Sequence, residues 1–373
     1  EYPMLIETID YKRGVIRILD QTLLPENEKF IYLRELNEVV EAICSLRIRG
    51  APAIGIAASY GLLLHLDNMI RSKSTGSLEY AFDREEGMRS FSFPDISSAD
   101  IKDRCLEARK KLEATRPTAV NLSWALERIF SVFGTQEVNP GRLCELIALR
   151  AFKIFSDEIE TELKIGENGS RFIRDGMKIL THCNAGGLAT AGYGTALAVL
   201  YSAKKEGKRF SVYADETRPL LQGARLTAWE LDRNGIDVSI LCDNAAASLF
   251  AAGRIDAVIV GADRIASNGD TANKIGTLGL AILCRVYRRP FYIAAPLSTF
   301  DMNISNGDDI PVEQRSGDEV SYFAGKRIVP ENTNIYNPAF DVTPSEYITS
   351  IITERGVIEN PDKEKISSFM RLE

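Results

Sequence analysis

The sequence has 373 residues, of which 45% are hydrophobic and 26% are charged, and its formal net charge is -7. This length and composition predict a globular protein with a large buried core and two domains. The acidic balance and the lack of a Lys/Arg block argue against a nucleic-acid partner, although a few local cations would hold a small acidic substrate. No purely apolar run approaches the roughly 20 residues that cross a bilayer, and the first residues lack a signal-peptide pattern. We therefore expect no membrane partner and a cytoplasmic location, with a nuclear pool as an option in a eukaryote.

The cysteines and histidines limit the chemistry that the chain can carry. Its six cysteines are dispersed without a C-x-x-C pair, which is typical of reduced thiols in a cytosolic protein rather than of a disulfide framework or a zinc site. Only two histidines are present, His65 and His182. Catalysis therefore has to depend on carboxylates, thiols, Lys or Arg.

In the first part of the chain, the sequence predicts a short strand followed by helices. A strand is indicated over residues 14–22, and a glycine turn at Gly50 precedes a helix rich in small residues within "RIRGAPAIGIAASYGLLLHL". Residues 71–98 carry Ser, Gly and charge without periodicity, so we expect an exposed or disordered insertion outside the catalytic machinery. Further helical patterns cover residues 35–46, 101–112, 122–133 and 142–163.

From Gly176 onward, apolar strands alternate with helical stretches. Near-continuous apolar strands joined by helices are typical of a doubly wound parallel sheet. We therefore predict an α/β protein with this sheet in a C-terminal domain, residues 146–373, and a smaller, mostly helical N-terminal domain, residues 1–145. Ligands in such sheets bind outside the carboxyl ends of the strands. The polar or reactive residues at these ends are Cys183, Asp215, Glu216, Asp243, Asn244, Asp263 and Arg264.

The stretch "THCNAGGLATAGYG", residues 181–194, is the first candidate for a reactive site. A strand, a glycine-rich turn and a small-residue helix favour an anion, but the glycine spacing differs from G-x-G-x-x-G, so the dinucleotide fingerprint fails. Cys183 is either a reagent, because a helix N-terminus can stabilise its thiolate, or a small buried residue. His182 is a poor base for it, because adjacent strand residues point to opposite faces.

The stretch "VIVGADRIASNGDTANKIG" is the second candidate. Its strand ends at Asp263, and we expect Asn273 and Lys274 to open the next helix. A carboxylate at the crevice and a Lys at a helix start would offer an acid and an anion clamp, although Asp263 and Arg264 could equally form a structural ion pair. Further candidate residues are Arg116, Glu216, Arg218, Gln222 and Arg225, and the several arginines among them would suit a phosphate site.

Six segments taken together resemble the 5-methylthioribose-1-phosphate isomerase family of the methionine salvage pathway. They occur in the family's order and cover nearly the whole chain apart from residues 71–98. The segment "DNAAASLF" departs from the family's pattern but keeps Asp243. The six segments are "RIRGAPAIGIAA", "RPTAVNLSWA", "THCNAGGLATAGYGTAL", "ETRPLLQGARLTAWEL", "VGADRIASNGDTANKIGT" and "APLSTFD".

The resemblance implies an aldose-to-ketose isomerisation that needs no metal or other cofactor. It implies that Cys183 and Asp263 are the catalytic pair, and that the product is methylthioribulose 1-phosphate. It also implies a smaller N-terminal domain, a Rossmann-like C-terminal domain and a homodimer. The residues that would hold the sugar phosphate, by motif position, are Arg49, Gly50, Ala51, Arg116, Gln222, Asn273 and Lys274.

The chemistry suits these residue types but leaves alternatives open. A phosphate ester on the anomeric carbon blocks ordinary ring opening, so an acid such as Asp263 has to protonate the ring oxygen, and Cys183 is placed to assist hydrogen transfer, as a proton or a hydride. Ribose-1,5-bisphosphate isomerase shares this pair but needs a second phosphate site. Regulatory subunits of the initiation-factor guanine-nucleotide exchange complex share the fold and typically lack the pair. The presence of both residues favours an enzyme.

Overall fold

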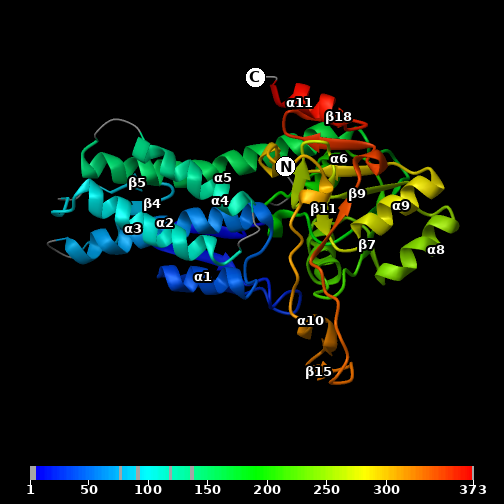
Figure 1. The fold of residues 1–373 in the computed structure, drawn as a ribbon, viewed down its shortest axis with the longest axis horizontal. Coiled ribbons are helices and arrows are strands. Elements are labelled where there is room, and N and C mark those ends of the chain that lie inside the picture. The colour runs from blue at the N-terminus through cyan, green and yellow to red at the C-terminus, as the bar shows by residue number, and fades with distance from the viewer. Residues whose placement is uncertain (1–5, 75–77, 90–92, 117–119, 135–137, 372–373) are drawn as a thin grey trace. The chain divides into compact units, whose positions relative to one another are not determined.

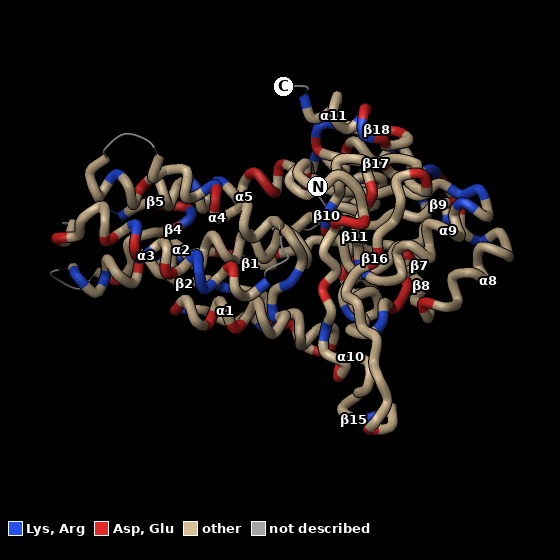
Figure 2. The backbone as a smooth tube through the Cα atoms, in the orientation of Figure 1, with Lys and Arg blue, Asp and Glu red and all other residues tan. Residues whose placement is uncertain are grey.

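The computed structural model describes residues 6–74, 78–89, 93–116, 120–134 and 138–371, and the chain forms two compact units (Figure 1). The N-terminal unit comprises Leu5–Glu160 and Gly187–Tyr193, and the C-terminal unit comprises Thr161–Gly186 and Gly194–Glu373. The division falls inside one long helix, α5 (Pro140–Ser170), rather than at 145/146, because this helix runs without interruption through the expected boundary. Positive and negative residues are interspersed along both units (Figure 2).

The N-terminal unit is mostly helical, as predicted, and also contains strands. An antiparallel sheet in the order β1-β2-β3 accompanies the helices, and only β2 lies where the sequence indicated a strand. The strands are β1 (Ile9–Lys12), β2 (Val15–Leu19) and β3 (Phe30–Leu33). The helices are α1 (Leu36–Cys44), α2 (Ala51–Lys73), α3 (Ser98–Glu113), α4 (Val120–Phe130) and the first part of α5.

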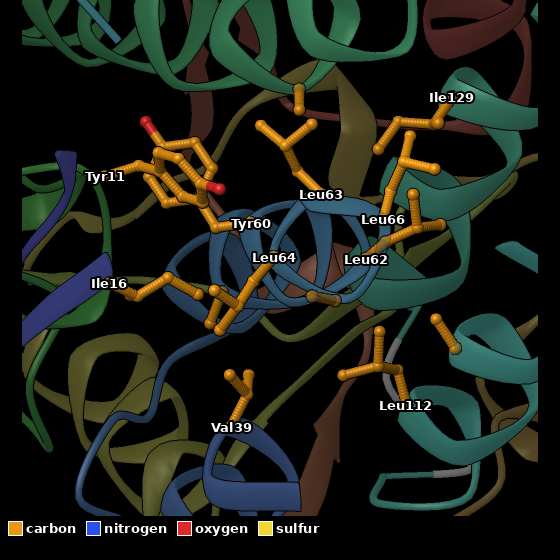
Figure 3. Close-up of a cluster of buried hydrophobic side chains, with 14 of the residues drawn as sticks. Tyr11, Ile16, Val39, Tyr60, Leu62, Leu63, Leu64, Leu66, Leu112 and Ile129 are labelled. Atoms are coloured by element: carbon orange, nitrogen blue, oxygen red, sulfur yellow. The ribbon is translucent and has the colours of Figure 1, made fainter. Parts of the chain in front are cut away.

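Helix α2 is the centre of the N-terminal core. Most of its 23 residues are buried, and Figure 3 shows Tyr60, Leu62, Leu63 and Leu64 projecting from it in several directions into the surrounding elements. By its length and mean hydropathy of 1.3 this helix could cross a membrane, but 89% of its most apolar stretch is buried inside the protein. A helix that is hydrophobic all round and covered by neighbours is a core helix.

Residues 71–98 differ from the exposed insertion that the sequence predicts. Residues Tyr80–Asp83 are buried, and a short hairpin of β4 (Phe82–Asp83) and β5 (Gly87–Met88) forms there. The Phe82 side chain is fully buried, and its carbonyl oxygen accepts a hydrogen bond from the Gly14 N–H at 3.2 Å. The expectation is therefore wrong for this part, because its aromatic residues pack into the core. Residues 75–77 and 90–92 lie outside the described residues.

The C-terminal unit contains the predicted parallel sheet. Its order is β18-β17-β12-β9-β6-β7-β8, parallel throughout except for β18, which pairs antiparallel with β17. The strands are β6 (Lys178–Thr181), β7 (Ser211–Asp215), β8 (Val238–Leu241), β9 (Ala257–Val260), β12 (Phe291–Ala294), β17 (Ser350–Thr353) and β18 (Gly356–Glu359). The accompanying helices are α6 (Ala196–Lys205), α7 (Ala228–Arg233), α8 (Ala246–Ala251), α9 (Thr277–Tyr287) and α11 (Lys363–Arg371). The α/β fold class is confirmed.

A second, four-stranded sheet in the C-terminal unit was not expected. Its order is β13-β10-β11-β16, built from β13 (Phe300–Asp301), β10 (Arg264–Ala266), β11 (Thr271–Lys274) and β16 (Phe340–Thr343). Asn273 and Lys274 therefore end a strand and do not open a helix, since α9 begins only at Thr277. The reason is that β11 pairs with strands on both sides, which fixes an extended backbone. A short helix and a small hairpin stand apart from this sheet (Figure 1). They are α10 (Asp318–Ser321) and the hairpin of β14 (Tyr322–Phe323) and β15 (Lys326–Arg327).

Candidate active site

Cys183 follows β6 in a backbone conformation that only a supporting structure maintains. Its φ is 60°, in the left-handed region that residues other than glycine adopt rarely. Its N–H donates to Thr217 Oγ1 at 2.8 Å, and its carbonyl accepts from Thr227 Oγ1 at 2.5 Å. The side chain is 8% exposed. Two threonines from the next βα segment thus fix the backbone of this cysteine on both sides.

A buried carboxyl group stabilises the residue after this cysteine. Asn184 donates to Glu230 Oε1 at 2.8 Å, and the Tyr201 hydroxyl lies 3.1 Å from Glu230 Oε2. Glu230 is fully buried, so its polar contacts are needed to offset the loss of water. The turn that carries Cys183 is therefore connected to both α6 and α7.

Asp263 is attached to β11 at the start of the hairpin of β10 and β11. The N–H of Asp263 donates to the carbonyl of Ala272 at 2.9 Å, and Arg264 pairs with Ala272 in the antiparallel register. Asp263 itself lies in a bend directly before β10, next to the paired segment of the hairpin. Arg264 forms an ion pair with Asp301 at 3.5 Å, so its guanidinium has a carboxylate partner other than Asp263.

Two of the other predicted binding residues of the C-terminal unit, Lys274 and Gln222, have a polar group that could bind a ligand. Lys274 Nζ lies 4.9 Å from the ring centre of Phe340, and no carboxylate in the described part of the chain pairs with it. Asn273 is oriented by a hydrogen bond from its Nδ2 to Thr277 Oγ1 at 3.0 Å. Gln222 is 7% exposed, and its buried Oε1 has no hydrogen-bond partner among the described residues. A cation and an unsatisfied acceptor of this kind suit a ligand that carries phosphate and hydroxyl groups.

The remaining predicted residues lie in the N-terminal unit. Arg49 Nε donates to Gln21 Oε1 at 3.3 Å, and Gly50 with a φ of 98° precedes α2, whose first residue is Ala51. A Cβ on Gly50 would collide with the backbone of Ala189, so glycine is required there by both φ and space. The start of α2 presents free N–H groups that favour an anion. Arg116 follows α3 and is half-buried.

His182 takes part in the site in a way that its sequence context did not suggest. Its Nδ1 lies 2.8 Å from Asp215 Oδ2, and its Nε2 lies 2.8 Å from the carbonyl oxygen of Ile275. Burial lowers the pKa of His182, but the contacts with Asp215, Asp243 and the Ile275 carbonyl together outweigh it, so the pKa is raised. Because both ring nitrogens have partners, His182 is not available as a base for Cys183. Asp215 is 33 residues away in sequence, so no local motif could have revealed this pair.

Asp243 completes a cluster with these two groups. One ligand atom each of His182, Asp215 and Asp243 lies within 4.8 Å of the others, a grouping that could hold a metal ion. However, the two oxygens of Asp243 accept the N–H groups of Thr217 and Arg218, both at 2.7 Å, and His182 is occupied as described. We interpret the cluster as a hydrogen-bonded framework that shapes the turn after β7.

Comparison with known proteins identifies the family. The Initiation factor 2 subunit family matches residues 47–360. The methylthioribose-1-phosphate isomerase of Thermotoga neapolitana is 46% identical over 98% of each chain, and that of Pelotomaculum thermopropionicum is 47% identical over 95% of this chain and 91% of its own.

Solved structures agree with this similarity. 5-Methylthioribose 1-phosphate isomerase from Pyrococcus horikoshii OT3 superimposes with a TM-score of 0.85 and 42% identity, covering 99% of this chain and 97% of that chain. Translation initiation factor eIF-2B, subunit delta, from A. fulgidus gives a TM-score of 0.81 and 37% identity, covering 98% of this chain and 100% of that chain. The chain therefore belongs to the initiation factor 2 subunit family, and within it to the methylthioribose-1-phosphate isomerases.

Proposed function

We propose that this chain converts 5-methylthioribose 1-phosphate to 5-methylthioribulose 1-phosphate in methionine salvage, with Cys183 and Asp263 as its catalytic residues. The observation that carries the proposal is the identity of 46% over 98% of the chain to an isomerase of this substrate. Within the C-terminal unit, both residues stand at the carboxyl ends of parallel strands, β6 and β9, where ligands of such sheets bind.

The reaction needs a proton donor at the ring oxygen. The phosphate ester on C1 prevents the opening that a free hemiacetal undergoes, so the C1–O4 bond breaks only as the ring oxygen gains a proton. Asp263 supplies that proton, and the C2 hydroxyl loses one as it becomes the ketone, so the acid is regenerated within one turnover. The backbone of Asp263 is bonded to Ala272, the residue before Asn273 on β11, and the Asn273 amide is proposed to orient the sugar.

The second requirement is hydrogen transfer from C2 to C1. Cys183 is 8% exposed on a fixed backbone, which places a thiol in a largely dry environment. A thiolate there removes a proton from C2 and returns it to C1, or it stabilises positive charge while a hydride moves between the same carbons. Both routes give the same ketose, and both lose rate when the thiol is removed.

The residues proposed to bind the substrate include cations and amides. In the C-terminal unit, Lys274 supplies charge for the phosphate and Gln222 Oε1 accepts from a sugar hydroxyl. In the N-terminal unit, Arg116 is the candidate cation, and the start of α2 after Gly50 has N–H donors. Lys274→Met and Arg116→Met should each weaken substrate binding by about 1.5 to 3 kcal/mol, because each removes a charge-assisted contact. The measurement is the dissociation constant of the substrate, determined on a Cys183→Ser background. An affinity like that of the parent would remove the substituted residue from the phosphate site.

One assay separates this function from its alternatives. The purified protein is incubated with methylthioribose 1-phosphate and, separately, with ribose 1,5-bisphosphate, and the ketose is followed by proton NMR. We expect turnover of the first sugar and little of the second, because the six family segments supply one evident cluster of candidate anion-binding residues. Faster turnover of the bisphosphate would assign the other isomerase. Binding without turnover of either sugar would favour a regulatory subunit like those named for initiation factors.

The assembly and location of the enzyme are further proposals, which the family relationship supports. We infer a homodimer that acts in the cytoplasm, in keeping with the acidic composition and the metabolic reaction. Light scattering coupled to size-exclusion chromatography distinguishes a dimer from a monomer of 41.3 kDa.

A further inference from the structure

We propose that His182 is a positioning residue that fixes Cys183 relative to Asn273 and Lys274, an inference that rests on the function proposed above. The imidazole lies where three segments of the C-terminal unit meet. His182 directly precedes Cys183. Its ring contacts the carboxyl group of Asp215 at the end of β7 and the carbonyl oxygen of Ile275, the residue after β11. The histidine is 1% exposed, so these contacts form away from water.

The protonation of the ring follows from its partners. A carbonyl oxygen only accepts hydrogen bonds, so Nε2 has to carry a proton to bond with Ile275. Nδ1 then shares a second proton with the carboxyl group of Asp215, either as an ion pair or as a neutral pair. Burial raises the pKa of Asp215, and the contact with Asp215 raises the pKa of His182, so the pair retains one proton. Nε2 keeps its hydrogen in either form.

Two further carboxylates surround this pair. Asp243, which follows β8, adds to the rise in the pKa of His182, and its own oxygens are held by N–H groups. Asp341 on β16 accepts from the N–H groups of Gly276 at 2.8 Å and Leu278 at 3.1 Å, and burial raises its pKa. The negative surroundings retain the shared proton, so the link from His182 to Ile275 persists across neutral pH.

The turn after β11 is shaped around the imidazole ring. Gly276 has a φ of 105°, and a Cβ there would lie 2.8 Å from His182 Cε1. Any other residue at this position would push against the ring or the turn, in addition to the strain of the left-handed backbone. The ring therefore sets the distance between β6 and the turn after β11. Lys274 is the last residue of β11, two residues before Gly276, so its position depends on the same spacing.

The contacts on the other side of the ring lead to Cys183. Thr217 Oγ1 accepts the N–H of Cys183, and the same hydroxyl donates to the backbone carbonyl of Asp215 at 3.1 Å. The turn after β7 thus holds the histidine side chain and the cysteine backbone together. A displacement of about 1 Å between a reacting group and its substrate can lower the rate about 100-fold, so a side chain that fixes this spacing affects turnover without touching substrate.

Two substitutions of His182 separate its two links. His182→Gln retains a donor close to the position of Nε2, whereas His182→Asn retains a donor only near Nδ1 and loses the bond to Ile275. We expect His182→Asn to raise KM and lower kcat by about 10-fold each, and His182→Gln to stay within about threefold for both. Equal losses in the two variants would overturn the proposal, as would wild-type kinetics in His182→Asn.

The chain provides a matched control in its other buried histidine. His65 lies on α2 in the N-terminal unit, is 7% exposed, and pairs with Glu107. His65→Asn removes the same kind of side chain from the helical core, away from the strand ends that carry the proposed catalytic residues. We expect its kcat and KM to stay within twofold of the wild type even where its melting temperature falls. Kinetic losses matching those of His182→Asn would show that both histidines act only through general stability.

A double-mutant cycle tests the path through the turn. If His182 acts by placing Lys274, the combined His182→Asn and Lys274→Met variant should lose several-fold less affinity than the product of the single losses. Strictly multiplicative losses would show that the two residues act independently and would contradict the proposed path.

One measurement on the wild-type protein depends neither on a folded variant of His182 nor on the proposed function. With only two histidines in the chain, 15N-histidine labelling gives two imidazoles, which His65→Asn assigns. We expect His182 Nε2 to carry a proton at every pH from about 6 to 9, because its partner is a carbonyl. An unprotonated Nε2 at any of these pH values would overturn the proposal. If Nε2 carries its proton but the protein does not turn over the sugar, only the proposed function is refuted.

Discussion

The core around α2 and the strand ends of the C-terminal unit bury polar groups in opposite ways. In the first region, the hydroxyls of Tyr11 and Tyr60 are buried without a hydrogen-bond partner among the described residues, and the rings do the packing (Figure 3). In the second, the hydroxyls of Thr217 and Thr227 bond directly to the backbone of Cys183. We therefore expect these two tyrosine hydroxyls to be dispensable, whereas the two threonine hydroxyls support the backbone of a residue that is proposed to be catalytic.

The two histidines repeat this contrast. Burial, together with the nearby Arg104, lowers the pKa of His65, so its ring is neutral at physiological pH. The pKa of His182 is raised by Asp215 in spite of burial. A histidine whose pKa is raised on folding stabilises the folded state fully at pH values below the pKa of the unfolded chain, near 6.5. This stabilisation is lost as the pH rises through the pKa of the folded state. Only the strand-end histidine therefore stabilises the folded state through its proton.

The largest effect on stability is expected in the helical core. Phe82→Ala should lower the free energy of unfolding by about 3 to 5 kcal/mol, because it removes a fully buried ring from β4. The folded fraction should keep its kcat, since the ring belongs to the core and not to the proposed site. Urea unfolding followed by circular dichroism measures the loss. A change below about 1 kcal/mol would mean that residues 80–83 do not belong to this core.

Asp67 offers a pH-dependent test of the same region. Burial raises its pKa to about 6 even though its Oδ1 accepts the N–H groups of Ala81 and Phe82. The folded state therefore binds this proton more strongly than the unfolded state, and the wild type loses stability as the pH rises from about 4 to about 6. Asp67→Asn should become more stable relative to the wild type by about 1.5 to 3 kcal/mol over this interval. Parallel stability curves of the two proteins from pH 4 to 7 would contradict the raised pKa.

Thr217→Val should have a smaller effect on stability but a clear one on turnover. It leaves the N–H of Cys183 without its acceptor at 2.8 Å, which costs about 1 to 3 kcal/mol of stability. It should also lower kcat, because the left-handed backbone of Cys183 loses one of its two anchors. Thr217→Ser keeps the hydroxyl and serves as the control. Valine and serine variants with the same kcat would remove Thr217 from the support of the site.

Tyr11→Phe should have the smallest effect. Its hydroxyl is buried without a partner among the described residues, so its removal should change the free energy of unfolding by less than about 1 kcal/mol, in either direction. The melting temperature measures this change. A loss above about 2 kcal/mol would show that this hydroxyl is a structural group and would weaken the contrast between the two regions.

Much of the parallel sheet could be predicted from the sequence because its strands are short apolar runs between helices. The expected strands that end near Cys183 and Asp263 are observed as β6 and β9. The second sheet could not be predicted in this way, since β11 reads "TANK" and has neither an apolar run nor alternation. Its extended backbone depends on pairing with β16, which lies far along the chain.

The site could be predicted only in part for the same reason. Motifs identified the residues proposed to touch substrate, but not the groups that hold them. Thr217, Thr227 and Glu230 carry no local pattern that connects them with Cys183 or Asn184, because their contacts arise from neighbouring βα segments. The buried segment at residues 80–83 was missed because surrounding Ser, Gly and charged residues outnumber its two aromatic side chains.

The central claim, that Cys183 and Asp263 act together in one isomerisation, is tested most directly by kcat for methylthioribose 1-phosphate in Cys183→Ser, Asp263→Asn and the double variant. Each single change should lower kcat by about 100-fold or more with unchanged thermal unfolding, the usual scale for losing a positioned acid or base. The double variant should lose much less than the product of the two, because groups that serve one step are not additive. Turnover near that of the wild type in Cys183→Ser, with unfolding unchanged, would contradict the account and reduce this cysteine to a packed side chain.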